Sequence, residues 1–258
     1  MAHGETSSLD DLPRPMPSAY GNRLHEDRSQ RRELLLKAIQ ETVDSKGTLM
    51  IPSFAIERTQ ELLLELDTLF ESNKLPRVPI FLDSPLATKI TEAYGKFSSY
   101  FNSDAVKILK DNAGLFRFPW LRFTHSVDES KSINNVPAPK IVIAGSGMSQ
   151  GGRILHHESR YLSDPNSSIL FIGYQVMGSL GRRILDGEKE VRIFRQPVPV
   201  RCRIRSIGAY SAHADQAGLV KCVSMAAAGG RLKNVFIVQG EDDSSQALAQ
   251  NIREDLGI

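Results

Sequence analysis

KIVIAGSGMSQGGRILHHESRYLS, residues 140–163, contains a short apolar run, a glycine-rich turn and the start of a helical pattern. The run from Ile141 to Ala144 is short, rich in β-branched residues and closed by glycine, which predicts a buried strand. Helical spacing of apolar residues resumes after Gly152. In an open parallel sheet, such a turn lies at the carboxyl ends of the strands, where backbone N–H groups attract anions. We therefore expect the turn to bind a phosphate, although a tight turn that needs glycine only for its backbone fits the same spacing.

Outward from this stretch, short apolar runs alternate with segments of helical periodicity. The runs that predict strands lie at residues 49–51, 78–82, 121–123, 168–172, 190–194, 198–207 and 235–238. Helical periodicity covers residues 29–45, 58–70, 128–133, 178–185, 217–228 and 244–256, and a further helix starts at Pro85. This alternation predicts an α/β fold with a mainly parallel sheet flanked by helices. The run 198–207 alternates apolar and basic residues, which predicts one strand with one wet face.

The composition and the cysteine count exclude several classes of protein. The 258 residues are 41% hydrophobic and 24% charged, as in ordinary globular domains, and the net charge of +2 gives no argument for nucleic acid by itself. No apolar run reaches the roughly eighteen residues of a membrane span, and residues 1–17 lack the pattern of a secretory signal. Those residues also lack periodicity, and we expect them to be poorly ordered. Cys202 and Cys222 form no disulfide framework and no zinc-ligand spacing, which fits a cytoplasmic location.

Candidate catalytic side chains are few. His213, within Ser211-Ala-His-Ala-Asp215, precedes a predicted helix and could act as a general acid, while a capping or core histidine fits equally well. Asp83 stands at the carboxyl end of a predicted strand, which suits a site residue and also a helix N-cap. His156 and His157 are adjacent on a predicted helix, so they face different directions, and we expect both to be structural.

A second chemical interpretation comes from Gly147-Met-Ser149-Gln-Gly151, which matches the G-x-S-x-G nucleophile elbow of serine hydrolases. Strand and helix flank it as required, and His213 follows in the right chain order with Asp186 as the candidate acid. The turn is longer than a strained elbow, which holds its serine almost on the strand. A serine hydrolase that uses Ser149 is therefore the second alternative to the phosphate-binding interpretation.

Six motifs follow one another from about residue 19 onward. They are Ala19-Tyr-Gly-Asn-Arg23, Ile51-Pro-Ser-Phe-Ala-Ile-Glu-Arg-Thr-Gln60, Leu82-Asp-Ser-Pro-Leu-Ala87, Gly145-Ser-Gly-Met148 with Gly151-Gly-Arg-Ile-Leu-His156, Phe171-Ile-Gly-Tyr-Gln175 and Ser211-Ala-His-Ala-Asp215. With these motifs in this order, the chain resembles the β-CASP family of metallo-β-lactamase-fold RNA nucleases, which act in RNA processing and mRNA 3′-end cleavage. The resemblance implies a β-CASP domain over about residues 28–176, inserted in a lactamase fold. Residues 1–27 would end the first half of that fold, 177–258 would form its C-terminal part, and RNA would lie in the cleft between domains.

The resemblance also implies a chemistry, namely two-zinc hydrolysis of an RNA phosphodiester. His213 matches the family's histidine near the metals, which is thought to assist as a general acid. The family's phosphate-holding turn and a basic residue facing the cleft have counterparts here, and Asp83 lies in a matching segment. The substrate-binding candidates are Ser146, Gly147, Met148, Arg58 and Asp83.

Three features depart from the family pattern. Pro17 stands where the family has glutamate, and Gln239 stands where it has its last zinc-ligand histidine. The sequence before Tyr20 has too few residues for the family's H-x-H-x-D-H zinc motif. Because a neutral amide cannot replace imidazole as a tight zinc ligand, we expect no tight zinc binding to this chain alone.

These departures lead us to expect a fragment or degenerate member of a zinc-dependent RNA-processing metallohydrolase, inactive by itself. A non-catalytic RNA-binding or partner subunit is the alternative that Pro17 and Gln239 favour. The expected partners are RNA and either a missing N-terminal half or a second copy of the chain, with no membrane involved.

Overall fold

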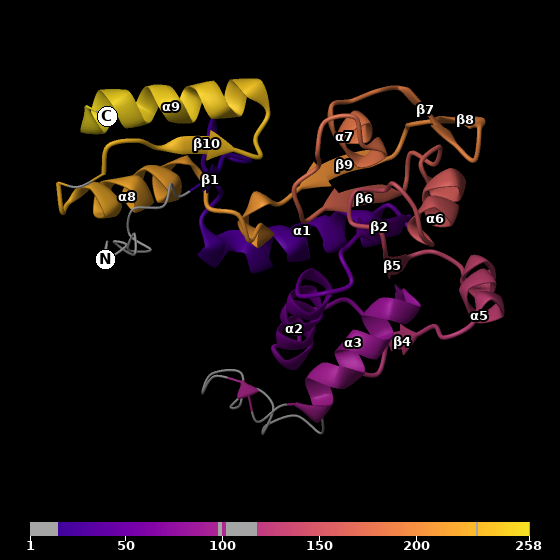
Figure 1. Cartoon of the computed structure of the whole chain (residues 1–258). Helices are drawn as coiled ribbons and strands as arrows, with labels where there is room; N and C mark the ends of the chain where they lie inside the picture. Colours follow the sequence, from indigo (N-terminus) through magenta and orange to yellow (C-terminus); the bar gives the residue numbers. More distant parts are fainter. Residues whose placement is uncertain (1–14, 98–99, 102–117, 231, 258) are drawn as a thin grey trace, which may run out of the picture. The chain divides into compact units, whose positions relative to one another are not determined.

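A computed structural model describes residues 15–97, 100–101, 118–230 and 232–257 of the chain (Figure 1). Its contacts divide the chain into two compact units, Glu26–Tyr210 and Met1–His25 with Ser211–Ile258. The expectations for residues 1–14, and for most of the irregular stretch 96–120, lie outside the described residues.

A parallel six-stranded sheet forms the centre of the larger unit, with strand order β4-β3-β5-β2-β6-β9 and every pairing parallel. Its strands are β2 (Thr48–Pro52), β3 (Ile80–Asp83), β4 (Leu121–Phe123), β5 (Lys140–Ala144), β6 (Ser168–Phe171) and β9 (Arg203–Ser206). The central strand β5 is buried along its whole length, as its unbroken apolar run predicts. The α/β fold with a mainly parallel sheet is therefore confirmed.

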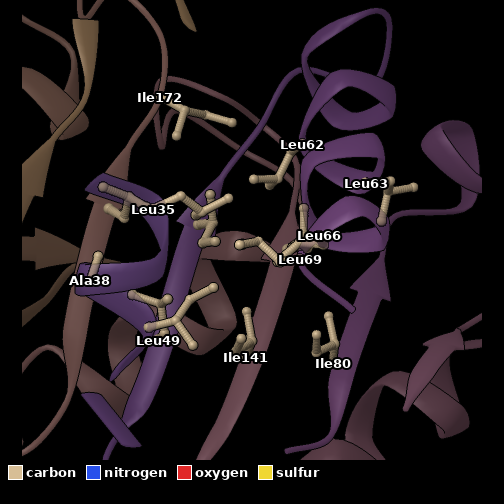
Figure 2. Close-up of a cluster of buried hydrophobic side chains, with 14 of the residues drawn as sticks. Leu35, Ala38, Leu49, Leu62, Leu63, Leu66, Leu69, Ile80, Ile141 and Ile172 are labelled. Atoms are coloured by element: carbon tan, nitrogen blue, oxygen red, sulfur yellow. The ribbon is translucent and has the colours of Figure 1, made fainter. Parts of the chain in front are cut away.

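Two hydrophobic cores lie on opposite faces of this sheet, because successive side chains of a strand point to opposite sides. On β5, Ile141 and Ile143 belong to one core, and Val142 and Ala144 to the other. Figure 2 shows the first core, where leucines of two helices gather over Leu49, Ile80 and Ile141. The helices of the larger unit are η2 (Arg28–Gln30), α1 (Arg31–Asp44), α2 (Arg58–Glu71), α3 (Pro85–Lys96), α5 (Val127–Ser132), η4 (Ile133–Asn135), α6 (Ile154–Tyr161), α7 (Leu180–Leu185) and η5 (Gly208–Tyr210).

The segment 190–207 differs from its prediction. It forms an antiparallel hairpin of β7 (Glu190–Ile193) and β8 (Gln196–Pro199), and then the separate strand β9. The single strand expected over 198–207 is thus wrong. The chain bends between β8 and β9, where the amides of Arg201 and Cys202 both donate to the carbonyl oxygen of Leu162, so the two strands pair with different neighbours. Because β9 pairs with β6, the larger unit extends to Tyr210. The expected boundary of the β-CASP domain at residue 176 stays a prediction.

The smaller unit contains a two-stranded parallel sheet and two helices. Strand β1 (Pro15–Pro17) pairs with β10 (Phe236–Val238), and the helices are α8 (Gln216–Ala227) and α9 (Asp242–Leu256). The core of this unit consists of Leu219 and Val223 of α8 with Leu248 and Ile252 of α9. No described helix of either unit is both long enough and apolar enough to span a membrane.

Candidate functional site

The turn between β5 and α6, residues 145–153, lies at the carboxyl edge of the parallel sheet, as predicted. Strand β5 lies between β2 and β3, so the loops that follow those two strands border the turn. The Ser53 amide donates to the Ala144 carbonyl oxygen at 2.9 Å, which ties the loop after β2 to the end of β5. This edge is where open α/β sheets bind ligands.

Hydrogen bonds within the turn leave several amides free. The Ser146 amide donates to Gly151 O at 3.0 Å, and Ser146 Oγ accepts from the Gln150 amide at 3.0 Å. The amides of Met148, Gly151 and Gly152 form no hydrogen bond to any residue that the structure describes. Met148 and Gly151 are half-buried and Gly152 is exposed. Unpaired N–H groups just before a helix N-terminus are the donors that bind an anion.

The carbonyl groups of the turn are held from the segment that follows β6. Gln175 Nε2 donates to Gly147 O at 2.8 Å and to Gly173 O at 3.1 Å, and the Gly181 amide donates to Met148 O at 3.1 Å. In a trans peptide the C=O and N–H point in opposite directions, so tying back Gly147 O directs the Met148 N–H away from Gln175. Gln175 ends the motif Phe171–Gln175, but the motif alone does not predict this role for it.

Phe54 packs against the turn from the loop after β2. A Cβ atom added to Gly147 would lie 2.6 Å from Phe54 Cδ2, so only glycine fits at this position without movement of the ring. Gly152 has φ +75°, and a Cβ there would lie 2.4 Å from Gly145 O. The glycines Gly147 and Gly152 are thus required for the backbone of the turn, and the binding of a phosphate stays a prediction.

Asp83 lies beside the turn at the end of β3, opposite Ala144, and its side chain is completely buried. Its carboxylate accepts four hydrogen bonds at 2.6–2.7 Å, from Thr124, Ser130, Arg153 and His157. Burial by itself raises the pKa of Asp83, but the four donors outweigh it and hold the pKa well below its usual range.

The roles of the residues around Asp83 follow from this network. Ser84, rather than Asp83, caps helix α3. His157 is buried on Asp83 while His156 is exposed, so the two histidines do face different directions. A part for Asp83 in ligand binding stays a prediction, and its burial limits that part to an indirect one through Arg153, which is half-buried in the turn.

Ser149 does not stand at the surface as a nucleophile elbow would place it. Its side chain is completely buried, and its hydroxyl donates to Glu158 of α6 rather than to a histidine. Burial raises the pKa of Glu158 to about 8, against the effect of the Ser149 hydrogen bond. The serine-hydrolase interpretation is therefore corrected: the G-x-S-x-G spacing belongs to a turn anchored by a buried serine–carboxyl pair.

Arg58 begins α2, the helix that follows the loop bearing Phe54. Its guanidinium donates to Glu61 and to the carbonyl oxygen of Tyr210, and it lies 3.7 Å from a carboxylate oxygen of Glu57. These partners hold the side chain in place and offset its charge. Substrate contact by Arg58 stays a prediction.

His213 belongs to the smaller unit, in the segment before α8, and is exposed. Its carbonyl oxygen accepts a hydrogen bond from His25 Nε2 at 2.9 Å, and its ring lies 6.3 Å from that of Tyr20. Asp215 caps α8 by accepting from the Gly218 amide at 2.9 Å, and it also accepts from the His25 amide. The Tyr20 and Ser211 motifs of the sequence are thus brought together, whereas a catalytic role for His213 stays a prediction.

Pro17 and Gln239 lie close together, because Pro17 pairs with Val238 in the small sheet. Neither residue suits zinc: proline has no side-chain donor atom, and an amide is a poor zinc ligand. Among the described residues, no group of three or more His, Cys, Asp and Glu side chains could hold a metal ion. The residues described here therefore do not fit a zinc centre.

Comparisons with known proteins agree with this architecture. The sequence model of the Beta-Casp domain matches residues 59–184, and that of the Zn-dependent metallo-hydrolase RNA specificity domain matches residues 197–258. Ribonuclease TTHA0252 of Thermus thermophilus is 36% identical over 231 residues, which cover 90% of this chain and 52% of that protein. An RNase J-like protein of Methanocaldococcus jannaschii is 31% identical over 224 residues, covering 87% of this chain and 50% of that protein. Integrator complex subunit 11 of Danio rerio is 28% identical over 242 residues, which cover 93% of this chain and 38% of that protein.

The α/β fold and these matches define the class of protein, that of chains with a Beta-Casp domain followed by an RNA specificity domain of metallo-hydrolases. Within this class, the chain belongs to the β-CASP family of metallo-β-lactamase-fold RNA nucleases. It spans about half or less of the length of the relatives named here.

Proposed function

We propose that this chain binds single-stranded RNA by seating a backbone phosphate on the turn 145–153. One observation carries the proposal: the amides of Met148, Gly151 and Gly152 are unpaired among the described residues while the neighbouring carbonyls are tied back. Such a set of N–H donors matches the charge and hydrogen-bonding capacity of a phosphate. Ser146 and Gly147 complete the turn, and Arg153 stands within it.

Asp83 supports this site by orientation rather than by contact. Its ion pair with Arg153, at 2.7 Å, keeps the guanidinium at the turn, and its hydrogen bond to His157 fixes the first turns of α6. Arg58, whose charge is offset by Glu61 and Glu57, would border the RNA near the loop after β2 as a hydrogen-bond donor. These roles rest on the resemblance together with the contacts given above.

The proposed catalytic contribution of the chain is His213 as a general acid, which would protonate the leaving oxygen of the phosphodiester. In this family, zinc would activate the attacking water and stabilise the negative charge that develops on the phosphoryl group. Because Pro17 and Gln239 do not suit zinc, we propose that the chain alone neither binds zinc tightly nor cleaves RNA. Zinc analysis of the purified chain, together with a cleavage assay, tests this directly, and stoichiometric zinc would contradict it.

A non-catalytic RNA-binding or partner subunit is the second candidate, favoured by the same two residues. The two candidates differ in one measurement, since only the first predicts zinc-dependent cleavage once a polypeptide with the family's H-x-H-x-D-H motif is added. That polypeptide or a second copy of this chain is the partner we propose. Cytoplasm is the proposed compartment, because Cys202 and the exposed Cys222 are both free thiols.

A matched pair of substitutions at Gly151 tests phosphate binding. The backbone at Gly151 does not have positive φ, and a Cβ there would meet no atom within 4 Å, so alanine fits. The Tm of the proline variant is measured alongside, because proline fixes φ at about −65°. Gly151→Pro removes one free amide, whereas Gly151→Ala keeps it. Loss of one hydrogen bond to a charged group corresponds to about tenfold weaker binding. We expect that loss for Gly151→Pro alone, measured by fluorescence anisotropy with a labelled single-stranded RNA. Equal binding by the two variants would refute the site.

A further inference from the structure

The tip of the β7–β8 hairpin presents an exposed aromatic ring on a backbone that rarely carries one. Ile193 pairs with Gln196, so Phe194 and Arg195 form a two-residue loop. Both have positive φ, 50° and 65°, at positions that normally favour glycine or asparagine. Phe194 is nevertheless 52% exposed, so its ring is not placed there to fill the core. Residues 185–196 also lie outside both matched domains, so neither match accounts for this loop.

This tip lies next to the proposed phosphate-binding turn. The Phe194 ring is 4.7 Å from the ring of His156, in the first turn of α6. His156 comes four residues after Gly152, and helical side chains tilt toward the N-terminus of their helix, which here is the turn itself. His156 is the third residue of α6, and each residue of helix rises about 1.5 Å, so the aromatic pair lies near the helix N-terminus that the turn precedes.

The surface around the tip carries positive charge that no residue of the described ranges neutralises. Arg192, Arg195 and Arg201 are exposed and form no ion pair with any residue in the described ranges. Other nearby arginines are paired: Arg182 with Asp186, Arg183 with Glu188 and Arg205 with Glu41. On the hairpin strands Glu190 is the one acidic residue, so the tip itself is cationic and aromatic.

We propose that Phe194 stacks on a base of single-stranded RNA next to the nucleotide whose phosphate sits on the turn. Arg195 and Arg192 would contact the phosphates on either side. An exposed ring beside unpaired guanidinium groups is the combination that binds single strands without base preference, because every base has a stacking face. This inference rests on the proposed function and extends it by a second contact surface.

Tryptophan fluorescence gives a direct test, because the chain has one tryptophan, Trp120. In the W120F/F194W variant of this 258-residue chain, the single indole lies at the hairpin tip. We expect its emission to be quenched by a single-stranded RNA dodecamer, and to be quenched little by a dodecamer of abasic sugar-phosphate. Equal effects of the two ligands would overturn base stacking.

Binding measurements separate this inference from the proposed function. We expect F194A to bind the dodecamer at least about fivefold more weakly, and F194Y to bind like the wild type, since base–aromatic stacking has that magnitude. Wild-type binding that Gly151→Pro weakens but F194A leaves unchanged would overturn the stacking proposal alone. No binding by the wild type would overturn both proposals. A change of oligomeric state in F194A at unchanged RNA affinity would assign the ring to a protein contact instead, and would also overturn the proposal.

Discussion

Gln175 donates a hydrogen bond from Nε2 to the carbonyl oxygen of Gly147 over 2.8 Å, and thereby joins the loop after β6 to the turn after β5. The two strands are not neighbours in the sheet, because β2 lies between them. Phe54, in the loop after β2, fills the space between, against Gly147 on one side and 3.7 Å from the position of a Cβ on Gly173 on the other. Three loops of the carboxyl edge, the turn 145–153 among them, thus form one packed structure.

Replacing Gln175 with alanine should loosen this structure. The buried carbonyl oxygen of Gly147 would lose its donor, at a cost of about 1–3 kcal/mol in the free energy of unfolding. That cost corresponds to a fall in Tm of roughly 2–4 °C per kcal/mol for a chain of this size. RNA affinity should fall as well, because the Met148 amide would no longer be directed outward. Gln150→Ala, an exposed amide in the same turn, is the matched control and should leave Tm unchanged.

Gly147→Ala should destabilise the chain by about 1–3 kcal/mol, the usual cost of overpacking. The new methyl group would overlap the Phe54 ring, whose Cδ2 lies 2.6 Å from its position. Combining Gly147→Ala with Phe54→Ala should restore part of the lost stability, because the ring that the new methyl group overlaps is then absent. A double-mutant cycle of denaturant unfolding measures the coupling, and additive effects would show that the ring does not limit residue 147.

Local periodicity predicts the core of this fold well. The strand at β5, the turn and the start of α6 follow from a β-branched run, glycines and helical spacing, which act over a few residues. The bracing by Gln175 joins residues 28 apart in the sequence and depends on the order of strands in the sheet, so no local pattern indicates it. The bonds to Asp83 are equally non-local, because their donors come from the residue after β4, from α5 and from α6, and meet only after folding.

The segment 198–207 shows the opposite failure, in which a true local pattern gives a wrong element. Its alternation of apolar and basic residues is real, but Pro197 and Pro199 have no amide hydrogen for a ladder on that side. β8 therefore pairs only with β7, and the chain bends before β9 enters the main sheet. Alternation alone does not distinguish two consecutive strands from one long strand.

Asp83→Asn should destabilise the chain more at neutral pH than at acidic pH. The pKa of Asp83 is held well below its ordinary value of 3.8 by four hydrogen bonds that outweigh burial. A carboxyl group with a lowered folded pKa stabilises the fold above its unfolded pKa, and this contribution is lost as the pH falls toward the folded value. The difference in Tm between wild type and Asp83→Asn should therefore be constant from pH 7 to about pH 5 and shrink below pH 4. A difference that stays constant down to pH 3 would exclude the ionised network.

Glu158→Gln should show the opposite pH dependence. Burial raises the pKa of Glu158 to about 8 from an ordinary value of 4.5, and its Oε2 has no hydrogen-bond partner among the described residues. Between these two pH values the unfolded chain loses a proton that the folded chain keeps, so stability falls as the pH rises, by up to about 1.4 kcal/mol per pH unit.

Glutamine resembles the protonated carboxyl group and does not titrate, so this fall should be absent in the variant. We expect similar Tm values for wild type and Glu158→Gln at pH 5, and a higher Tm for the variant at pH 8. Glu190→Gln, an exposed carboxyl on β7, should follow the wild type at both pH values. If Glu158→Gln and the wild type change in parallel from pH 5 to pH 8, the carboxyl group that anchors Ser149 is ionised throughout, and the turn is held by a charged pair rather than a neutral one.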